Sequence, residues 1–128
     1  MVVDSSALVS ILLEEPKYER LLEKAMSAEV TIVGAPQALE TVMVLSGRSD
    51  NDPRFLLASL LRTMGAEVVP FTEQHYDAAV SAFLRYGKGR HPAGLNFGDC
   101  MSYALAAVSG LPLLYFGDDF SKTDITAA

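Results

Sequence analysis

Three carboxylic acids of this chain each stand alone in a long uncharged segment. Each is the only charged residue of its segment: Asp4 in residues 1–13, Glu40 in residues 30–47 and Asp99 in residues 92–117. An isolated carboxylate is costly to bury unless it is paired or binds a metal ion, and these segments contain no Lys or Arg that could act as a partner. The pattern therefore predicts that the three acids meet in one metal site.

A fourth acidic position follows near the end of the chain, where Asp118 and Asp119 are adjacent. Clustered carboxylates without His or Cys select hard cations, so we expect Mg²⁺, with Mn²⁺ as an alternative. Such an ion lowers the pKa of bound water and neutralises charge on phosphoryl oxygens, which suits phosphodiester hydrolysis. Ser6 and Ser102 are candidates to support the ligands or to position water, because Ser102 shares a helical face with Asp99.

Each acid also has an ordinary structural interpretation. Asp4 could cap a helix, Glu40 could be an exposed helix residue, Asp99 could interact with a helix dipole, and Asp118 with Asp119 could form a turn. Four separate structural roles explain the joint placement of these acids less well than one shared carboxylate site does.

Short apolar segments alternate with amphipathic ones along the whole chain. Strands are predicted at Val2–Val3, Val30–Val33, Val68–Val69 and Leu113–Phe116, with a last short strand from Ile125. The first helix is predicted to be capped by Ser5 or Ser6 and to run to Leu12. The other helices are predicted from Pro16 to Ala28, from Pro36 to Ser46, from Pro53 to Met64, from Glu73 to Tyr86 and from Phe97 or Gly98 to Gly110. Asn96 is the expected cap of the last helix.

This alternation predicts an α/β fold, with three αβα layers around a central, mostly parallel sheet of four to five strands. In such sheets the ends of the strands and the starts of the following helices share one edge, where functional sites form. Asp4 and the Asp118–Asp119 pair follow strands, while Glu40 and Asp99 lie early in helices. We therefore expect all four positions to converge at that edge.

Composition sets the remaining bounds. The 128 residues suit one domain, and no apolar segment is long enough for a transmembrane helix. The N-terminus does not look like a signal peptide, and Cys100 is the only cysteine, so we expect a cytoplasmic protein without membrane contact. The net charge of −6 disfavours nucleic-acid binding, although bound cations at the acids would offset part of that charge.

Four segments resemble a known family of nucleases. They are VVDSSALVSIL at the start, LETVMVL around Glu40, YGKGRHPAGLNFGDCMSYALA around Asp99, and LLYFGDDFSKTDI near the end. The chain resembles PIN-domain nucleases, specifically VapC toxins of type II toxin–antitoxin pairs, over nearly its whole length. The resemblance implies a single PIN-like domain over residues 1–128. It also implies a Mg²⁺-dependent endoribonuclease that cuts tRNA or rRNA, forms a homodimer, and is silenced by a VapB-like antitoxin.

Carried over residue by residue, the resemblance implies that Asp4, Glu40 and Asp99 are the three central catalytic acids and metal ligands. The fourth position stays open between Asp118 and Asp119, and the Gly-x-Asp-Phe ending favours Asp119. The family commonly has Thr or Ser after its first acid, and here both following residues are Ser.

A basic, Gly-rich loop precedes the Asp99 helix. Lys88, Arg90 and His91 give it the composition of a phosphate-contacting segment, so we expect it to bind RNA; a solvated surface loop is the alternative. Two other functions remain open. One is a haloacid-dehalogenase-type phosphatase, which normally has Asp where this chain has Ser6. The other is a catalytically silent binding module, which would have no evident need for the acids.

Overall fold

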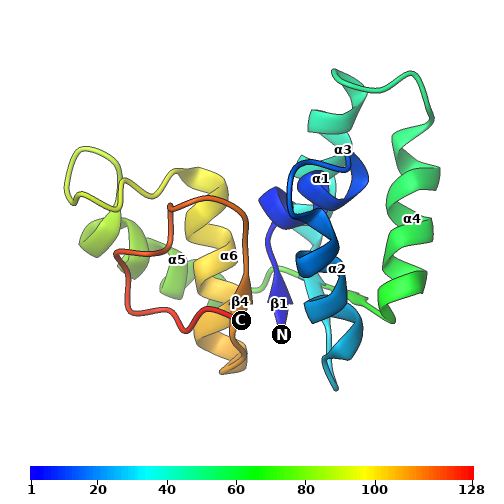
Figure 1. Cartoon of the computed structure of the whole chain (residues 1–128). Helices are drawn as coiled ribbons and strands as arrows, with labels where there is room; N and C mark the ends of the chain where they lie inside the picture. Colours follow the sequence, from blue (N-terminus) through cyan, green and yellow to red (C-terminus); the bar gives the residue numbers. More distant parts are fainter.

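Four short parallel strands form the centre of the computed structural model, which describes all 128 residues (Figure 1). Their order across the sheet is β3-β2-β1-β4. The strands are β1 (Val2–Val3), β2 (Ile32–Gly34), β3 (Glu67–Val69) and β4 (Leu113–Leu114). The helices are α1 (Ser5–Leu12), α2 (Tyr18–Ser27), α3 (Ala35–Ser46), α4 (Pro53–Met64), α5 (Glu73–Tyr86) and α6 (Phe97–Ser109).

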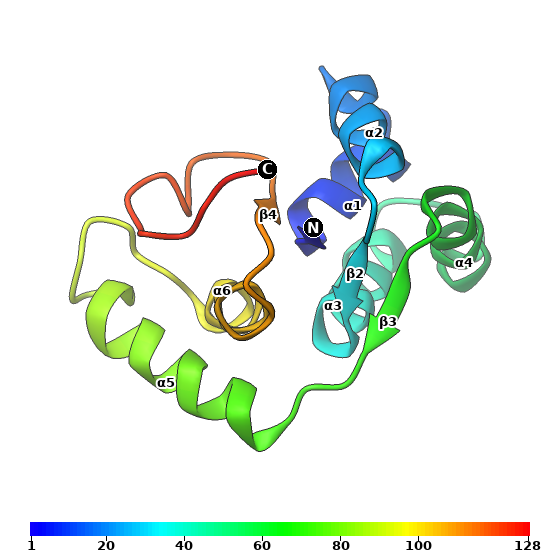
Figure 2. The ribbon, with the colours of Figure 1, turned by 90° about the horizontal axis from the view of Figure 1, so that it is seen from below.

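Helices cover both faces of this sheet, as Figure 2 shows from below. Neighbouring strand residues point to opposite faces, and the two hydrophobic cores follow that alternation. Val3 and Leu114 pack in the core beneath α1, α2 and α4, whereas Val2 and Leu113 pack in the core beneath α5 and α6. The predicted three-layer α/β architecture is confirmed.

Local sequence signals place most helix ends. Asp52 caps α4 by accepting a hydrogen bond from the backbone N–H of Arg54, and Gly65 ends this helix with a left-handed φ of 61°. Thr72 begins α5 with a capping box, and Asn96 begins α6 in the same way. These boundaries agree with the predictions because each depends on contacts within a few residues.

Other boundaries differ from the predictions. Asp4, and not Ser5 or Ser6, is the cap of α1, because its carboxylate accepts the backbone N–H of Ser6. The second helix begins at Tyr18 and not at Pro16, since Lys17 adopts a left-handed φ of 76° that interrupts the turn.

The strands are also shorter or shifted. Strand β2 begins at Ile32, because Val30 lies outside the sheet and is 52% exposed. Strand β4 ends at Leu114, and the expected strand from Ile125 is reduced to one parallel bridge between Leu113 and Ala127.

No helix has the length and apolar character that crossing a membrane requires.

Candidate active site

Asp4 occupies the carboxyl end of the central strand β1 and is only 3% exposed. Its Oδ2 accepts hydrogen bonds from the Ser6 backbone N–H at 2.9 Å and from Ser6 Oγ at 2.5 Å. Its Oδ1 accepts a hydrogen bond from Ser102 Oγ at 2.5 Å, which joins β1 to α6. Helix capping, the structural interpretation of Asp4, is therefore confirmed. A helix cap need not be buried, however, and need not accept hydrogen bonds from two serine hydroxyls, as Asp4 does.

Ser6 connects Asp4 to the segment that carries the last acids. The backbone N–H of Phe116 donates to Ser6 Oγ at 3.0 Å, while that hydroxyl donates to Asp4. The chain after β4 is thereby held beside the end of β1. The two serines singled out from the sequence, Ser6 and Ser102, thus both contact Asp4 directly.

Glu40 lies on α3 and is half-buried. Its Oε2 accepts a hydrogen bond from Ser5 Oγ at 2.8 Å, a contact between residues 35 positions apart. On its other side Glu40 faces the start of α6 at Gly98, where a Cβ would lie 2.8 Å from Oε2. Glu40 is therefore held between α1 and α6 and is not an ordinary exposed helix residue.

Asp99 lies in the first turn of α6, where it takes part in the capping box. Its Oδ2 accepts the backbone N–H of Asn96 at 2.9 Å, and the Asn96 side chain accepts the N–H of Asp99. The pKa of Asp99 is raised to about 6: burial is the largest cause, the Asn96 hydrogen bond opposes it, and the charges of Asp119, Asp4 and Glu40 add to it. Asp119, Asp4 and Glu40 are therefore all close enough to Asp99 to disfavour its negative charge.

Asp118 and Asp119 differ in their relation to the group formed by Asp4, Glu40 and Asp99, which we call the cluster. Asp119 is among the charges that raise the pKa of Asp99, and Asp118 is not. The backbone carbonyl of Asp118 accepts hydrogen bonds from both the N–H and the Oγ of Ser121, as in a turn. Both side chains are exposed. The turn interpretation thus describes Asp118, while the charge of Asp119 acts on Asp99.

No basic side chain neutralises the cluster. The three ion pairs of the protein join Arg48 to Glu15, Arg54 to Asp52, and Arg85 to Asp124. Like charges that converge without a basic partner suit a divalent cation. The side chains do not form a group of three or more Asp, Glu, His or Cys residues arranged around one ion position. Oxygen donors of this kind nevertheless fit Mg²⁺, which commonly takes one or two carboxylates and completes its coordination with water.

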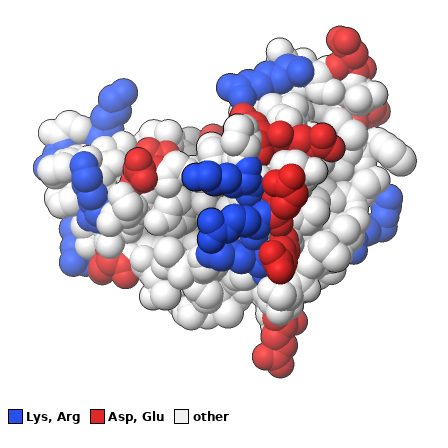
Figure 3. All heavy atoms as spheres, viewed as in Figure 1, with Lys and Arg blue, Asp and Glu red and all other residues white.

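The basic loop between α5 and α6 stands at one side of the molecule. On the face drawn in Figure 3, separate blue side chains lie at the edge where Figure 1 places α5 and this loop. Lys88 and Arg90 are exposed and have no ion pair. The guanidinium of Arg90 lies 5.4 Å from the centre of the Phe83 ring, and His91 Nδ1 accepts the backbone N–H of Ala93. Lys88 and Arg90 thus have no anionic partner, while the ring of His91 stabilises the loop by accepting a backbone hydrogen bond within it.

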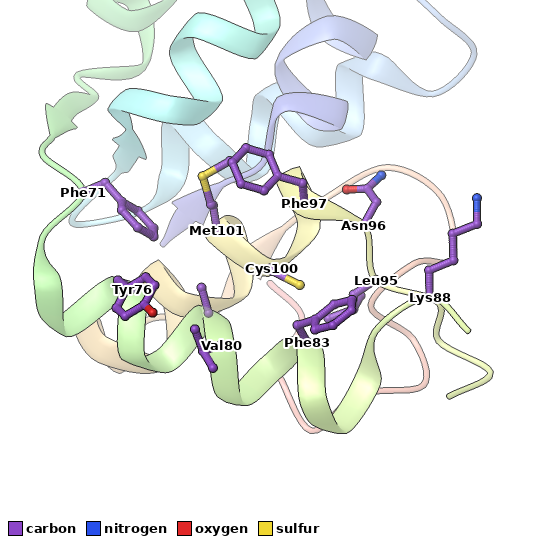
Figure 4. A pocket seen from close by; sticks show the side chains of 11 residues that line it. Phe71, Tyr76, Val80, Phe83, Lys88, Leu95, Asn96, Phe97, Cys100 and Met101 are labelled. Carbon is purple, nitrogen blue, oxygen red and sulfur yellow. The ribbon is translucent and has the colours of Figure 1, made fainter. Parts of the chain in front are cut away.

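Two adjoining apolar grooves lie beside the acids. The larger, of about 660 Å³, runs between α5 and α6, with Lys88 at one end (Figure 4). The second runs between α3 and α6 and includes Glu40 in its lining. Phe71, Phe97 and Met101 line both grooves, and Phe97 is 83% exposed. The two grooves therefore form one apolar face, which we call the α3–α5–α6 face.

Three positions at the site were missed by the sequence analysis. Ser5 reaches Glu40, Gly98 leaves room for Glu40, and Gln37 donates to the Gly98 carbonyl at 3.5 Å. Ser5 had a visible signal, since it directly follows Asp4. Gly98 and Gln37 had none, because their importance depends on α3 meeting α6 across 61 residues.

A parallel sheet with helices on both faces and acids at its carboxyl edge defines the class of protein. Residues 1–125 match the PIN domain, and the chain belongs to the PIN domain family. It is 46% identical over 128 residues to "Ribonuclease VapC" of Mycolicibacterium smegmatis, covering 99% of this chain and 98% of that protein. It is 42% identical over 125 residues to "Ribonuclease VapC30" of Mycobacterium tuberculosis, covering 98% and 95%. The resemblance to VapC-type PIN-domain proteins is confirmed.

Solved structures share the fold at much lower sequence identity. Mycobacterium tuberculosis VapC20, described as a sarcin-ricin loop cleaving toxin, superposes with a TM-score of 0.79 at 17% identity, covering 99% of this chain and 97% of that one. A chain of a toxin–antitoxin complex from Klebsiella pneumoniae has a TM-score of 0.74 at 12% identity, covering 99% and 95%. Both likenesses concern the fold.

Proposed function

We propose that this protein is a metal-dependent endoribonuclease and the toxin of a toxin–antitoxin pair. The observation that carries the proposal is the convergence of Asp4, Glu40, Asp99 and Asp119 from four separate elements, without a basic partner. The names of the VapC relatives at 42% and 46% identity support RNA as the substrate. Mg²⁺ is the proposed cofactor, with Mn²⁺ as a substitute, because the donors are carboxylate oxygens.

Asp4 and Asp99 are the proposed principal metal ligands, with Glu40 and Asp119 completing the site. When bound, the ion supplies an activated water and neutralises charge on the scissile phosphate. Ser6 and Ser102 hold the Asp4 carboxylate in a single orientation through their hydroxyls. Ser5 does the same for Glu40. Because these hydroxyls fix the acids before substrate arrives, little reorganisation is needed during the reaction.

Lys88 and Arg90 are the proposed phosphate-binding side chains, with His91 beside them. Both cations are exposed and lack an anionic partner, so they are available to RNA phosphates. A structured RNA such as tRNA or rRNA is the proposed substrate class.

Two protein partners belong to this proposal. The first is a VapB-like antitoxin, in line with the VapC relatives and with the fold likeness to a chain of a toxin–antitoxin complex. The second is another copy of this chain, seated on the α3–α5–α6 face. Leu39, Met43 and Phe97 are 61%, 67% and 83% exposed there. Glu40 and Lys88 are the only charged residues that line the two grooves, so this face suits a protein surface better than an RNA backbone.

Neither alternative function has comparable support. A haloacid-dehalogenase-type phosphatase would need an acid at position 6, but Ser6 lies there and donates to Asp4. A catalytically silent binding module would leave a repulsive cluster of acids without a purpose.

Incubation of the purified protein with total RNA tests the proposal. We expect discrete cleavage with Mg²⁺ or Mn²⁺, none with EDTA, and none by the Asp99→Asn variant. Cleavage that persists in both EDTA and the variant would overturn the metal mechanism. Hydrolysis of small phosphate monoesters without any RNA cleavage would favour the phosphatase instead.

A further inference from the structure

Gly98 allows a close approach of the Glu40 side chain on α3 to the backbone of α6. A Cβ at this position would lie 2.8 Å from Glu40 Oε2 and 2.9 Å from Oε1, nearer than real side chains allow. Its φ lies outside the left-handed region, so the backbone does not itself require glycine. Glycine within a helix is less stable than alanine. The missing side chain therefore serves the Glu40 carboxylate, which occupies that space.

Gln37 lies one turn before Glu40 on α3 and also contacts Gly98 of α6. It is 1% exposed, and its Nε2 donates to the Gly98 carbonyl at 3.5 Å. Its Oε1 is buried without any hydrogen-bond partner. A second glycine, Gly34, makes room for it, since a Cβ there would lie 2.2 Å from Gln37 Oε1. A buried, unpaired oxygen is unfavourable, so an apolar side chain of similar length would pack here at least as well.

Gln37 and Glu40 are three residues apart on one face of α3, and that face meets the start of α6. Their polar ends lie on the two sides of Gly98, one at its carbonyl oxygen and one at its Cα. Ser5 holds the Glu40 carboxylate by its Oε2 at 2.8 Å. The carboxylate is thus fixed between a hydroxyl on α1 and an open Cα on α6.

We propose that Gly98 and Gln37 are positioning residues that set where the Glu40 carboxylate lies relative to Asp99. Gly98 provides the space, and the Gln37 hydrogen bond to the Gly98 carbonyl ties that space to α3. The inference rests on the proposed function, because it assigns these residues a role in the same metal-dependent site. It extends the site to two residues that neither carry charge nor contact the substrate.

The Gly98→Ala variant tests the space requirement. The added methyl group meets the end of a flexible side chain, so the protein folds and the Glu40 carboxylate moves. In a crystal structure of the metal-free variant we expect the Ser5–Glu40 hydrogen bond to be lost. We expect Mn²⁺ affinity and kcat for RNA cleavage to fall about tenfold or more, as for residues that orient metal ligands. Gly47→Ala is the matched control, because its Cβ would lie 3.7 Å from the nearest atom, the Val44 carbonyl oxygen.

The Gln37→Met variant tests the hydrogen bond from Gln37 to the Gly98 carbonyl. Gln74→Met is its control, since Gln74 is the only other glutamine and is exposed on α5. We expect Gln37→Met to keep or raise the melting temperature, because it removes the unpaired oxygen, yet to lower kcat and Mn²⁺ affinity. A merely structural residue would instead lose stability and activity together.

The inference is overturned if Gly98→Ala keeps the Ser5–Glu40 hydrogen bond, or if either variant binds Mn²⁺ within about twofold of the wild type. Failure of the wild type to cleave RNA would overturn the proposed function instead. Even then, metal-free crystal structures of the wild type and of Gly98→Ala would show whether Gly98 determines the position of the Glu40 carboxylate.

Discussion

Replacing Asp99 with Asn should make the metal-free protein more stable at neutral pH while abolishing its activity. Burial, supported by the charges of Asp119, Asp4 and Glu40, raises the pKa of Asp99 from 3.8 to about 6. The folded protein therefore keeps this proton to higher pH than the unfolded chain does. The associated stability is fully present below about pH 4 and is lost as the pH rises through about 6.

The size of the effect follows from the two pKa values. At about 1.4 kcal/mol per pH unit, the difference is worth at most about 3 kcal/mol. Because the Asp99 carboxyl is only part-buried, solvent screening reduces this to about 1–2 kcal/mol. Asparagine can still accept the Asn96 N–H, so the capping box survives. For a domain of this size, about 4 °C of melting temperature per kcal/mol gives a rise of about 4–8 °C at pH 7.5.

Thermal unfolding of both proteins in EDTA between pH 4 and pH 8 measures this difference. We expect it to disappear towards pH 4, and we expect Mg²⁺ to stabilise the wild type much more than the variant. Asp124 provides a control of opposite sign, because its hydrogen bond from Tyr103 lowers its pKa. Asp124→Asn should therefore destabilise the protein at neutral pH. If Asp99→Asn lowered the melting temperature at pH 7.5, burial and the neighbouring acids would not disfavour the charge of Asp99 as we argue.

Three further predictions concern the site and its basic loop. Ser102→Ala should lower the free energy of unfolding by about 1.5–3 kcal/mol in urea titrations, because it removes a buried hydrogen bond to a charged group. Replacing Lys88 and Arg90 together with Ala should weaken RNA binding and reduce the slope of log K against log[salt] by about 1.4, as measured by fluorescence anisotropy. Asp119→Asn should reduce RNA cleavage far more than Asp118→Asn, since only Asp119 contributes to the repulsion at the cluster.

Each of these has an outcome that contradicts it. A Ser102→Ala change of under about 0.5 kcal/mol would show that the hydroxyl is not needed to stabilise the buried carboxylate. An unchanged salt slope for the loop variant, matching an Arg62→Ala control on α4, would place the RNA elsewhere. Equal losses for the two aspartates would mean that Asp118 turns towards the cluster when the metal binds.

Much of the fold could be predicted because its signals are local. The capping residues Thr72 and Asn96 and the glycine that ends α4 act on their immediate neighbours, so the corresponding helix ends agree with the structure. Prediction failed where distant packing decides. Val30 has strand propensity, yet it lies outside the sheet, and Ile125 belongs to a segment that forms only one bridge to β4.

By itself, the sequence determined which residues could do chemistry. Acids isolated in apolar segments must be accommodated somewhere, and the alternation of strands and helices already directs them to one sheet edge. Only the tertiary structure decided how they are held: Ser102 donates a hydrogen bond to Asp4, and Ser5 donates one to Glu40. These contacts join residues up to 98 positions apart. Hydrogen bonds and close packing depend on distances of a few tenths of an ångström, which the packing of α3 and α6 against the sheet sets and local residue patterns do not.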